Sequence, residues 1–301
     1  MSDPVAVTPE LLRRTPLPRP SEEGDKEERG RVLVVAGSVQ VPGGALLAGI
    51  GALRAGAGKL QIATCASVAP HLGLAVPEAL VAGLPETAEG GISPDAATAL
   101  IERARRCDAV LIGPGMMDRP AVAALAGALL RGLDGPPDGP SLLLDAGALA
   151  ALEQAGAAPP HRAGRMVVTP HSGEMASLLG MERADVSADP PGVALRAARQ
   201  LGAVVALKGS CTHIATPEGA RWAYDRGRVG LATSGSGDTL AGIVAGLLAR
   251  GAPPEVAAIW AVYLHGEAGN RLARRHGPLG YLARELLAEV PAILAELCDW
   301  S

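Results

Sequence analysis

Short, continuously apolar runs recur along the chain from residue 31, and amphipathic stretches separate them. The runs are Val32–Val35, Ala109–Ile112, Leu142–Leu144, Met166–Val168 and Val204–Leu207. Continuous rather than alternating hydrophobicity predicts strands that are covered on both faces, as in a mostly parallel sheet. Apolar residues at helical spacing over 240–248 and 256–264 predict two of the helices between or after the strands. The repeated order of strand, turn and helix predicts a three-layer α/β fold with right-handed crossovers.

Two segments differ from this alternation. Residues 1–29 carry five prolines and then a run of charged residues, which predicts a leader that is either laid over the domain or mobile. Residues 212–222 contain the turn Pro217-Glu218-Gly219 and predict an antiparallel hairpin. We interpret residues 135–140 as a surface loop. The remainder, residues 30–301, is predicted to form a single domain.

Composition excludes several classes of function. Hydrophobic residues make up 48% of the 301-residue chain and charged residues 19%, which excludes disorder of the chain as a whole. A net charge of -4 and an aromatic content of 2% argue against binding to nucleic acid or to an anionic membrane surface. The four cysteines include no Cys-x-x-Cys pair, so we expect reduced thiols, a cytoplasmic location and no zinc site.

The strongest candidate for chemistry is a glycine-rich turn, Gly235-Ser236-Gly237-Asp238, which opens a long apolar helix. Backbone N–H groups at such a helix N-terminus are unpaired and lie at the positive end of the helix dipole, so they can bind an anion such as phosphate. A carboxylate there would repel phosphate unless it takes the proton from a hydroxyl that attacks the phosphorus. The alternative is that Asp238 is an ordinary acidic residue of a first helical turn.

Further polar turns follow the predicted strands. They are Gly37–Ala45, Gly113-Pro114-Gly115, Asp145-Ala146-Gly147, Thr169–Glu174 and Lys208-Gly209-Ser210. The carboxyl ends of parallel strands share one edge of a sheet, where ligands bind, so we expect these turns to converge. Lys208 could neutralise a phosphate or could simply extend to solvent. His265 and Glu267 are two residues apart on a helix and do not share a face, so we assign them no metal site.

Taken in order, these strings resemble the nucleotide-dependent NAD(P)H-hydrate dehydratases, a family of the ribokinase-like superfamily. The similar strings are Gly37-Ser38 with Gly44-Ala45, Ile112-Gly113-Pro114-Gly115, Leu144-Asp145-Ala146, Thr169-Pro170-His171-Ser172-Gly173-Glu174-Met175, Leu207-Lys208-Gly209 and Gly235-Ser236-Gly237-Asp238. The resemblance covers nearly the whole chain from about Lys26 onward. His171 is the most discriminating residue, because vitamin kinases of this fold usually have Asn after Thr-Pro.

The resemblance implies repair of hydrated NADH or NADPH, in which ADP, or ATP in some relatives, drives the loss of water. It implies that Asp238 is the catalytic base. Substrate contacts are implied at Ala45, Gly113, Gly115, His171 and Asp238. The implied adenine-nucleotide site consists of Lys208, Gly209, Ser210, Cys211, Thr212, Gly235, Ser236 and Gly237. Mg²⁺ is expected with the nucleotide, held by phosphate and water rather than by named side chains.

The resemblance also implies a homo-oligomer, a tetramer in particular, and a separate NAD(P)H-hydrate epimerase as a functional partner. Two other functions stay open at this point: a small-molecule kinase of the same fold, which would release a phosphorylated vitamin precursor, and a catalytically silent nucleotide-binding protein. The sequence does not distinguish ADP from ATP, or hydrated NADH from hydrated NADPH.

Overall fold

A computed structural model describes residues 3–19, 25–134, 139–155 and 164–298. The described residues form one sheet of ten strands in the order β1-β10-β9-β8-β7-β6-β5-β2-β3-β4, in which β9 alone runs antiparallel to its neighbours. The strands are β1 (Val5–Ala6), β2 (Arg31–Val35), β3 (Lys59–Cys65), β4 (Ala79–Leu84), β5 (Ala109–Ile112), β6 (Ser141–Leu144), β7 (Met166–Val168), β8 (Val204–Leu207), β9 (Thr212–Ala215) and β10 (Arg221–Tyr224).

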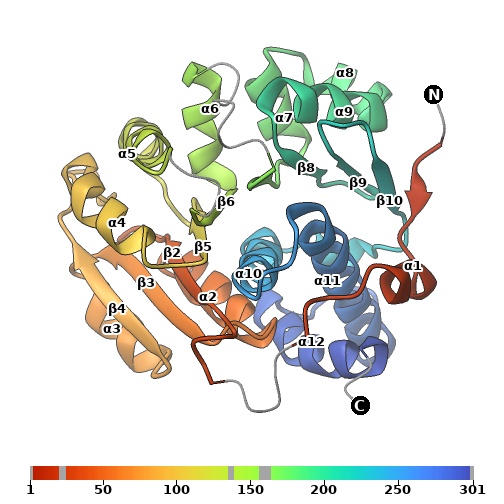
Figure 1. Ribbon diagram of the computed structural model, residues 1–301, viewed down its shortest axis with the longest axis horizontal. Helices are drawn as coiled ribbons and strands as arrows, with labels where there is room; N and C mark the ends of the chain where they lie inside the picture. The colour runs from red at the N-terminus through yellow and green to blue at the C-terminus, as the bar shows by residue number, and fades with distance from the viewer. Residues whose placement is uncertain (1–2, 20–24, 135–138, 156–163, 299–301) are drawn as a thin grey trace.

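Helices cover both faces of the sheet, which gives the three layers that the sequence predicts (Figure 1). One face carries α2 (Gly43–Arg54), α3 (Ala69–Ala75), α10 (Ser236–Ala249), α11 (Pro254–His276) and α12 (Ala283–Leu297). The other carries α4 (Ala97–Ala104), α5 (Arg119–Gly132), α6 (Ala150–Ala155), α7 (Ser172–Leu179), α8 (Arg183–Ala188) and α9 (Pro190–Leu201). None of the helices in the described part of the chain is both long and apolar enough to cross a membrane.

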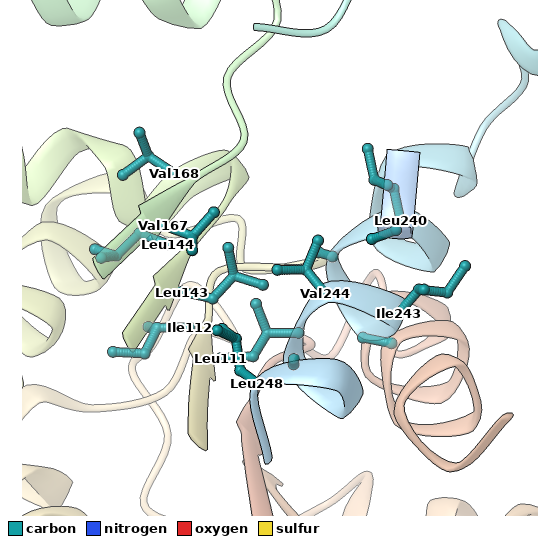
Figure 2. Close-up of a cluster of buried hydrophobic side chains, with 14 of the residues drawn as sticks. Leu111, Ile112, Leu143, Leu144, Val167, Val168, Leu240, Ile243, Val244 and Leu248 are labelled. Atoms are coloured by element: carbon teal, nitrogen blue, oxygen red, sulfur yellow. The ribbon is translucent and has the colours of Figure 1, made fainter. Parts of the chain in front are cut away.

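The centre of the core lies where α10 packs on β5 and β6. Figure 2 shows Leu111 and Leu143 pointing toward Val244 of α10, whereas Ile112 points away from it. Side chains alternate between the two faces of a strand, and here both faces are buried. Each fully buried aliphatic side chain contributes roughly 1.5–3 kcal/mol. Burial on both faces is the physical reason for the continuous apolar runs in the sequence.

The five strands predicted from apolar runs are all present, and the hairpin is confirmed as β9 and β10, although it extends to Tyr224. Strands β3 and β4 were not among the predictions. Lys59 and Gln61 interrupt the apolar pattern of β3. β4 is an edge strand in which five of the six residues are exposed or only partly buried, although Ala79–Leu84 is apolar throughout.

The N-terminal segment packs against the rest of the molecule. β1 pairs with β10 at the sheet edge, and it leads into α1 (Pro9–Arg14), whose Leu12 is fully buried. The Trp260 indole N–H donates a hydrogen bond to the Thr15 carbonyl oxygen at 2.7 Å. The division of the chain between residues 29 and 30 stays a prediction. The predicted loop at 135–140 falls mainly on residues 135–138, which lie outside the described residues.

The chain reverses its direction across the sheet between β2 and β5. It runs from β2 through β3 to β4 on one side, then returns to β5 on the other side of β2. The two loops that leave β2 and β5 therefore lie at the point of reversal on the carboxyl edge, which is the usual ligand position in such sheets. They touch at their bases, where the Gly37 N–H donates to the Pro114 carbonyl oxygen at 2.7 Å.

Candidate active site

A buried ion pair lies at the carboxyl edge of the sheet. Asp145 follows β6 and Lys208 follows β8, and Lys208 Nζ lies 2.7 Å from Asp145 Oδ1. The Thr169 hydroxyl donates to the same oxygen at 2.7 Å. Burial acts to lower the pKa of Lys208, but the nearby carboxylates of Asp145 and Glu174 outweigh it and raise that pKa. Lys208 is therefore a permanently charged group held in place below the rim of the site.

His171 stabilises the start of the helix that follows it. It is the N-cap of α7, and its Nδ1 accepts hydrogen bonds from the N–H groups of Gly173 at 2.9 Å and Glu174 at 3.2 Å. Glu174 Oε2 accepts in return from the His171 N–H at 2.8 Å, which completes a capping box. A parallel bridge sets His171 beside Lys208. The ring is thus fixed by the cap, while 57% of the side chain stays exposed.

Asp238 lies in the first turn of α10, close to this ion pair. Burial and the negative charges of Asp145 and Glu174 raise the pKa of Asp238 from 3.8 to about 6, against the opposing effect of Lys208. The carboxylate is therefore ionised near neutral pH but holds a proton more readily than an ordinary aspartate. A carboxylate with a raised pKa is a better proton acceptor, and such groups concentrate at active sites.

The N-terminus of α10 has free donors. Gly235, the N-cap, has a φ of +83° and provides no side chain to cap the helix. The structure gives no partner, among the described residues, to the backbone N–H groups of Gly237 and Asp238. A Cβ built on Gly237 would lie 3.4 Å from Lys208 Nζ. Two unpaired N–H groups, a helix dipole and an ammonium group therefore meet at one point and form an anion site.

The turns after β2 and β5 are packed closely against each other and against β6. A Cβ on Gly44 would lie 2.6 Å from the Gly115 backbone nitrogen, and one on Gly113 would lie 1.8 Å from the Asp145 carbonyl oxygen. Glycine is required at both positions. Ala45 is fully buried under this contact and Gly113 is also buried, whereas Gly115 is partly exposed. Substrate contacts at these three residues stay predictions. Of the three, Gly115 is the residue with surface that a ligand can reach.

The segment predicted to bind the nucleotide, residues 208–212, begins at the same edge of the sheet. Lys208 is followed by an exposed turn, Gly209-Ser210, and then by Cys211 and Thr212, which are partly buried at the start of β9. Ser236, by contrast, is only 5% exposed and is turned into the protein. The structure thus joins Lys208, Gly237 and Asp238 directly, and it sets Gly209–Thr212 next to them along the chain. Their roles in binding remain predictions.

A cavity of about 360 Å³ adjoins His171 on the side away from α10. It is lined by Met116, Met117, Arg119, Ala146, Gly147, Leu149, Ala150, Glu153, His171, Gly173, Glu174 and Ser177. Ala146 has a φ of +49°, and no other non-glycine residue of the described ranges has a positive φ. Alanine in this conformation is strained, and such strain is typical of functional sites. The turn after Asp145 lies at the carboxyl edge of the sheet and lines this cavity.

The described residues contain no group of three or more His, Cys, Asp or Glu side chains arranged to hold a metal ion. The charges nevertheless suit a cation that arrives with a ligand. The charges of Asp145 and Glu174 act on the Asp238 carboxylate, and Lys208 is the cation that interacts with all three carboxylates. This excess of negative charge fits Mg²⁺ bound mainly by nucleotide oxygens and water, which needs few protein ligands.

Sequence reasoning assigned no role to Asp145 or Glu174, although both stood in the turns that it singled out. The signal for Asp145 was its position directly after a buried strand, at the edge where ligands bind. Its partner Lys208 is 63 residues away in sequence. His265 was considered only as a metal ligand; in the structure its Nε2 lies 2.9 Å from Ser236 Oγ.

The open, mostly parallel sheet with helices on both faces gives this protein a ribokinase-like α/β fold. The family model described as NAD(P)H-hydrate dehydratase matches residues 32–292. An ADP-dependent (S)-NAD(P)H-hydrate dehydratase from Xanthomonas campestris pv. campestris is 50% identical over 97% of this chain and 96% of that protein. The chain belongs to the NAD(P)H-hydrate dehydratase family.

Two further comparisons agree. The crystal structure of the ADP/ATP-dependent NAD(P)H-hydrate dehydratase from Bacillus subtilis, co-crystallized with ATP/Mg²⁺, superposes with a TM-score of 0.83. The two chains are 33% identical, with 99% of this chain and all of that chain covered. A bifunctional NAD(P)H-hydrate repair enzyme from Moorella thermoacetica is 40% identical over 94% of this chain, which spans 53% of that longer protein.

Proposed function

We propose that this protein restores NADH or NADPH from the (6S) hydrated forms, using the terminal phosphoryl group of ADP or ATP to remove the added water. The observation that carries the proposal is the meeting of Asp238, Lys208 and the free N–H groups of α10 at the sheet edge, in a chain of the dehydratase family. This arrangement provides a base and an anion site within reach of each other, which phosphoryl transfer requires.

Asp238 accepts the proton of the hydroxyl on the hydrated ring. That oxygen attacks the terminal phosphorus as the bond to the bridging oxygen of the nucleotide breaks, which releases AMP when ADP is the donor. The phosphate then leaves with the former hydroxyl oxygen while the ring nitrogen lone pair forms a C=N bond. Loss of a proton from the adjacent carbon to solvent forms the ring C=C bond and returns the lone pair to nitrogen. The hydroxyl oxygen departs in phosphate, so atoms and charge balance.

The protein contributes position and charge to these steps. Lys208, held by Asp145, which in turn accepts a hydrogen bond from Thr169, faces the anion site with a fixed positive charge. The N–H groups of Gly237 and Asp238 bind the phosphoryl oxygens as their negative charge grows, which accounts for most of the rate enhancement in such reactions. Mg²⁺ bound with the nucleotide would neutralise part of the phosphate charge, close to the carboxylates of Glu174 and Asp238.

Substrate contacts at Gly115 and His171 would place the hydrated ring between the α10 turn and the α7 cap. The cavity of about 360 Å³ beyond His171 supports this orientation, because it gives room for a part of the dinucleotide outside the ring. A dinucleotide extends far beyond its nicotinamide ring, so a substrate of this class needs such an extension of the site.

We also infer three properties of the protein in the cell. All four cysteines are free, which supports a reducing, cytoplasmic location. The exposed apolar side chains of Leu74 and Leu80 on α3 and β4 support a subunit contact in a homotetramer. A bifunctional relative that is nearly twice as long supports a second repair activity, an epimerase, supplied here by another chain.

The test is to mix the protein with hydrated NADH, Mg²⁺ and either ADP or ATP, and to follow the near-ultraviolet absorbance of the dihydronicotinamide ring. The proposal requires a rise in absorbance that depends on nucleotide, and the better nucleotide identifies the phosphoryl donor. A stable phosphorylated product without any rise in absorbance would instead establish a kinase. Light scattering on the same preparation measures the oligomeric state.

A further inference from the structure

A histidine behind the anion site holds its first turn. Ser236 is the first residue of α10, and its Oγ lies 2.9 Å from Nε2 of His265, in the middle of α11. Neither side chain is used in the mechanism above. Ser236 is only 5% exposed, so its hydroxyl faces the protein interior rather than solvent.

The end of α10 needs such a contact because it has no cap. Most helices bind their free N–H groups with a side chain at the N-cap, but a capping side chain here would occupy the donors that an anion needs. Gly235 leaves them free. The turn is held from behind instead, by the Ser236–His265 hydrogen bond and by the Thr239 hydroxyl, which donates to the Gly235 carbonyl oxygen at 3.1 Å.

The ring of His265 is suited to this position because it is neutral. Burial lowers the pKa of His265 from 6.5 to about 4; a hydrogen bond to the Ser236 backbone opposes this shift, and the positive charge of Lys208 adds to it. Throughout the neutral pH range the ring adds no second positive charge behind Lys208. It acts only as a rigid hydrogen-bonding group between α10 and α11.

We propose that His265 is a positioning residue for nucleotide binding: its hydrogen bond to Ser236 keeps the N–H groups of Gly237 and Asp238 aimed at the terminal phosphoryl group. The inference rests on the proposed function for the identity of the anion. His265 itself touches neither substrate nor nucleotide. Its loss therefore weakens binding of the terminal phosphate without abolishing the chemistry.

The experiment compares nucleotide affinity in matched variants. His265→Leu keeps similar volume without a hydrogen bond, His265→Gln restores a hydrogen-bonding group, and Ser236→Ala removes the other partner. His276→Leu, at the exposed end of α11, is the control. Calorimetry measures the Kd of ADP and of AMP, which lacks the terminal phosphate, and thermal unfolding confirms that each variant is folded.

We expect His265→Leu and Ser236→Ala each to weaken ADP binding roughly three- to tenfold, the size of one net hydrogen bond. AMP binding should change by less than about twofold in both, and His265→Gln should recover most of the ADP affinity. The double variant should bind ADP no more weakly than either single variant, because both remove the same interaction.

Equal losses for ADP and AMP, or effects of the two single variants that multiply in the double variant, would overturn the inference. If His265→Leu fails to fold, the ratio of ADP to AMP affinity in Ser236→Ala decides the same question. A wild-type protein that binds ADP but does not restore NADH overturns the proposed function, and the affinity ratios still test the positioning role. The two failures are therefore distinguishable.

Discussion

Lys208 Nζ lies 2.7 Å from Asp145 Oδ1, although the two residues follow different strands and are 63 positions apart. The pair is almost completely enclosed: 19% of the Lys208 side chain and 2% of the Asp145 side chain are exposed. Removing one member of a buried pair leaves the other charge without a partner, which is strongly destabilising. The contact therefore fixes the position of the Lys208 ammonium group, which opposes the rise in the pKa of Asp238.

The first prediction concerns this dependence. Lys208 opposes the rise in the pKa of Asp238, so Lys208→Gln should raise that pKa further above about 6. The acidic limb of kcat/KM for hydrated NADH should then move to higher pH, because the base must be deprotonated. Lys208→Arg keeps the charge and is the control. An acidic limb at the same pH in the wild type and both variants would show that Lys208 does not influence the pKa of Asp238.

The second prediction concerns the base itself. Asp238→Asn should lower turnover by roughly 10²- to 10⁴-fold, the usual contribution of a general base, while the Kd of ADP stays within about threefold. Stopped assays of NADH formation and calorimetry measure the two quantities. Asp185→Asn on the exposed surface of α8 is the matched control. Near-normal turnover in Asp238→Asn would exclude the base role.

The third prediction concerns stability and pH. The native state holds a proton on Asp238 more tightly than the unfolded chain, so the stabilisation from this group is fully present below pH 3.8 and is lost as the pH rises through about 6. The difference is at most about 3 kcal/mol. Asp238→Asn should thus be more stable than wild type at neutral pH and similar to it near the acid end. Denaturant unfolding at the two pH values measures this, and a variant less stable than wild type at neutral pH would contradict it.

The sequence predicts the centre of this fold better than its edges. Strands such as β5 and β6 are buried on both faces, so their apolar runs are continuous and easily recognised. β3 contains Lys59 and Gln61, which interrupt that pattern, whereas β4 is apolar in sequence but lies at the sheet edge, where most of its residues are not buried. β3 depends on pairing with β2, and β4 depends on pairing with β3; these are tertiary contacts that a local sequence pattern does not encode.

The candidate site divides in a similar way. Gly237 and Asp238 were predictable because a local string, a glycine turn before an apolar helix, is enough to create an anion site. The Asp145–Lys208 pair and the Ser236–His265 hydrogen bond join residues 63 and 29 positions apart. Local patterns identify the residues that face the ligand, whereas the residues that hold them become visible only in the fold.

A fourth prediction tests the N-terminal segment. Leu12 of α1 is fully buried, and the segment is tied down by the hydrogen bond from Trp260 to Thr15. Leu12→Ala should therefore cost about 2–5 kcal/mol of unfolding free energy, as expected for a core leucine. Leu11→Ala, one position away and partly exposed, should cost clearly less. Equal and small effects in denaturant unfolding would show that the segment folds independently of the core.

The last prediction separates the two roles of His171. Because its Nδ1 caps α7, His171→Ala should lose about 0.5–2 kcal/mol of stability, whereas His171→Asn, a good N-cap residue, should lose little. If the ring also contacts the hydrated dinucleotide, both variants should raise the KM for hydrated NADH while leaving the Kd of ADP unchanged, because neither retains the imidazole of this side chain, which is 57% exposed. Unfolding measurements and steady-state kinetics on the same two proteins test both effects. A normal KM in His171→Asn would assign His171 to the helix cap alone, because a residue that binds substrate through its ring cannot be replaced by one that only caps the helix.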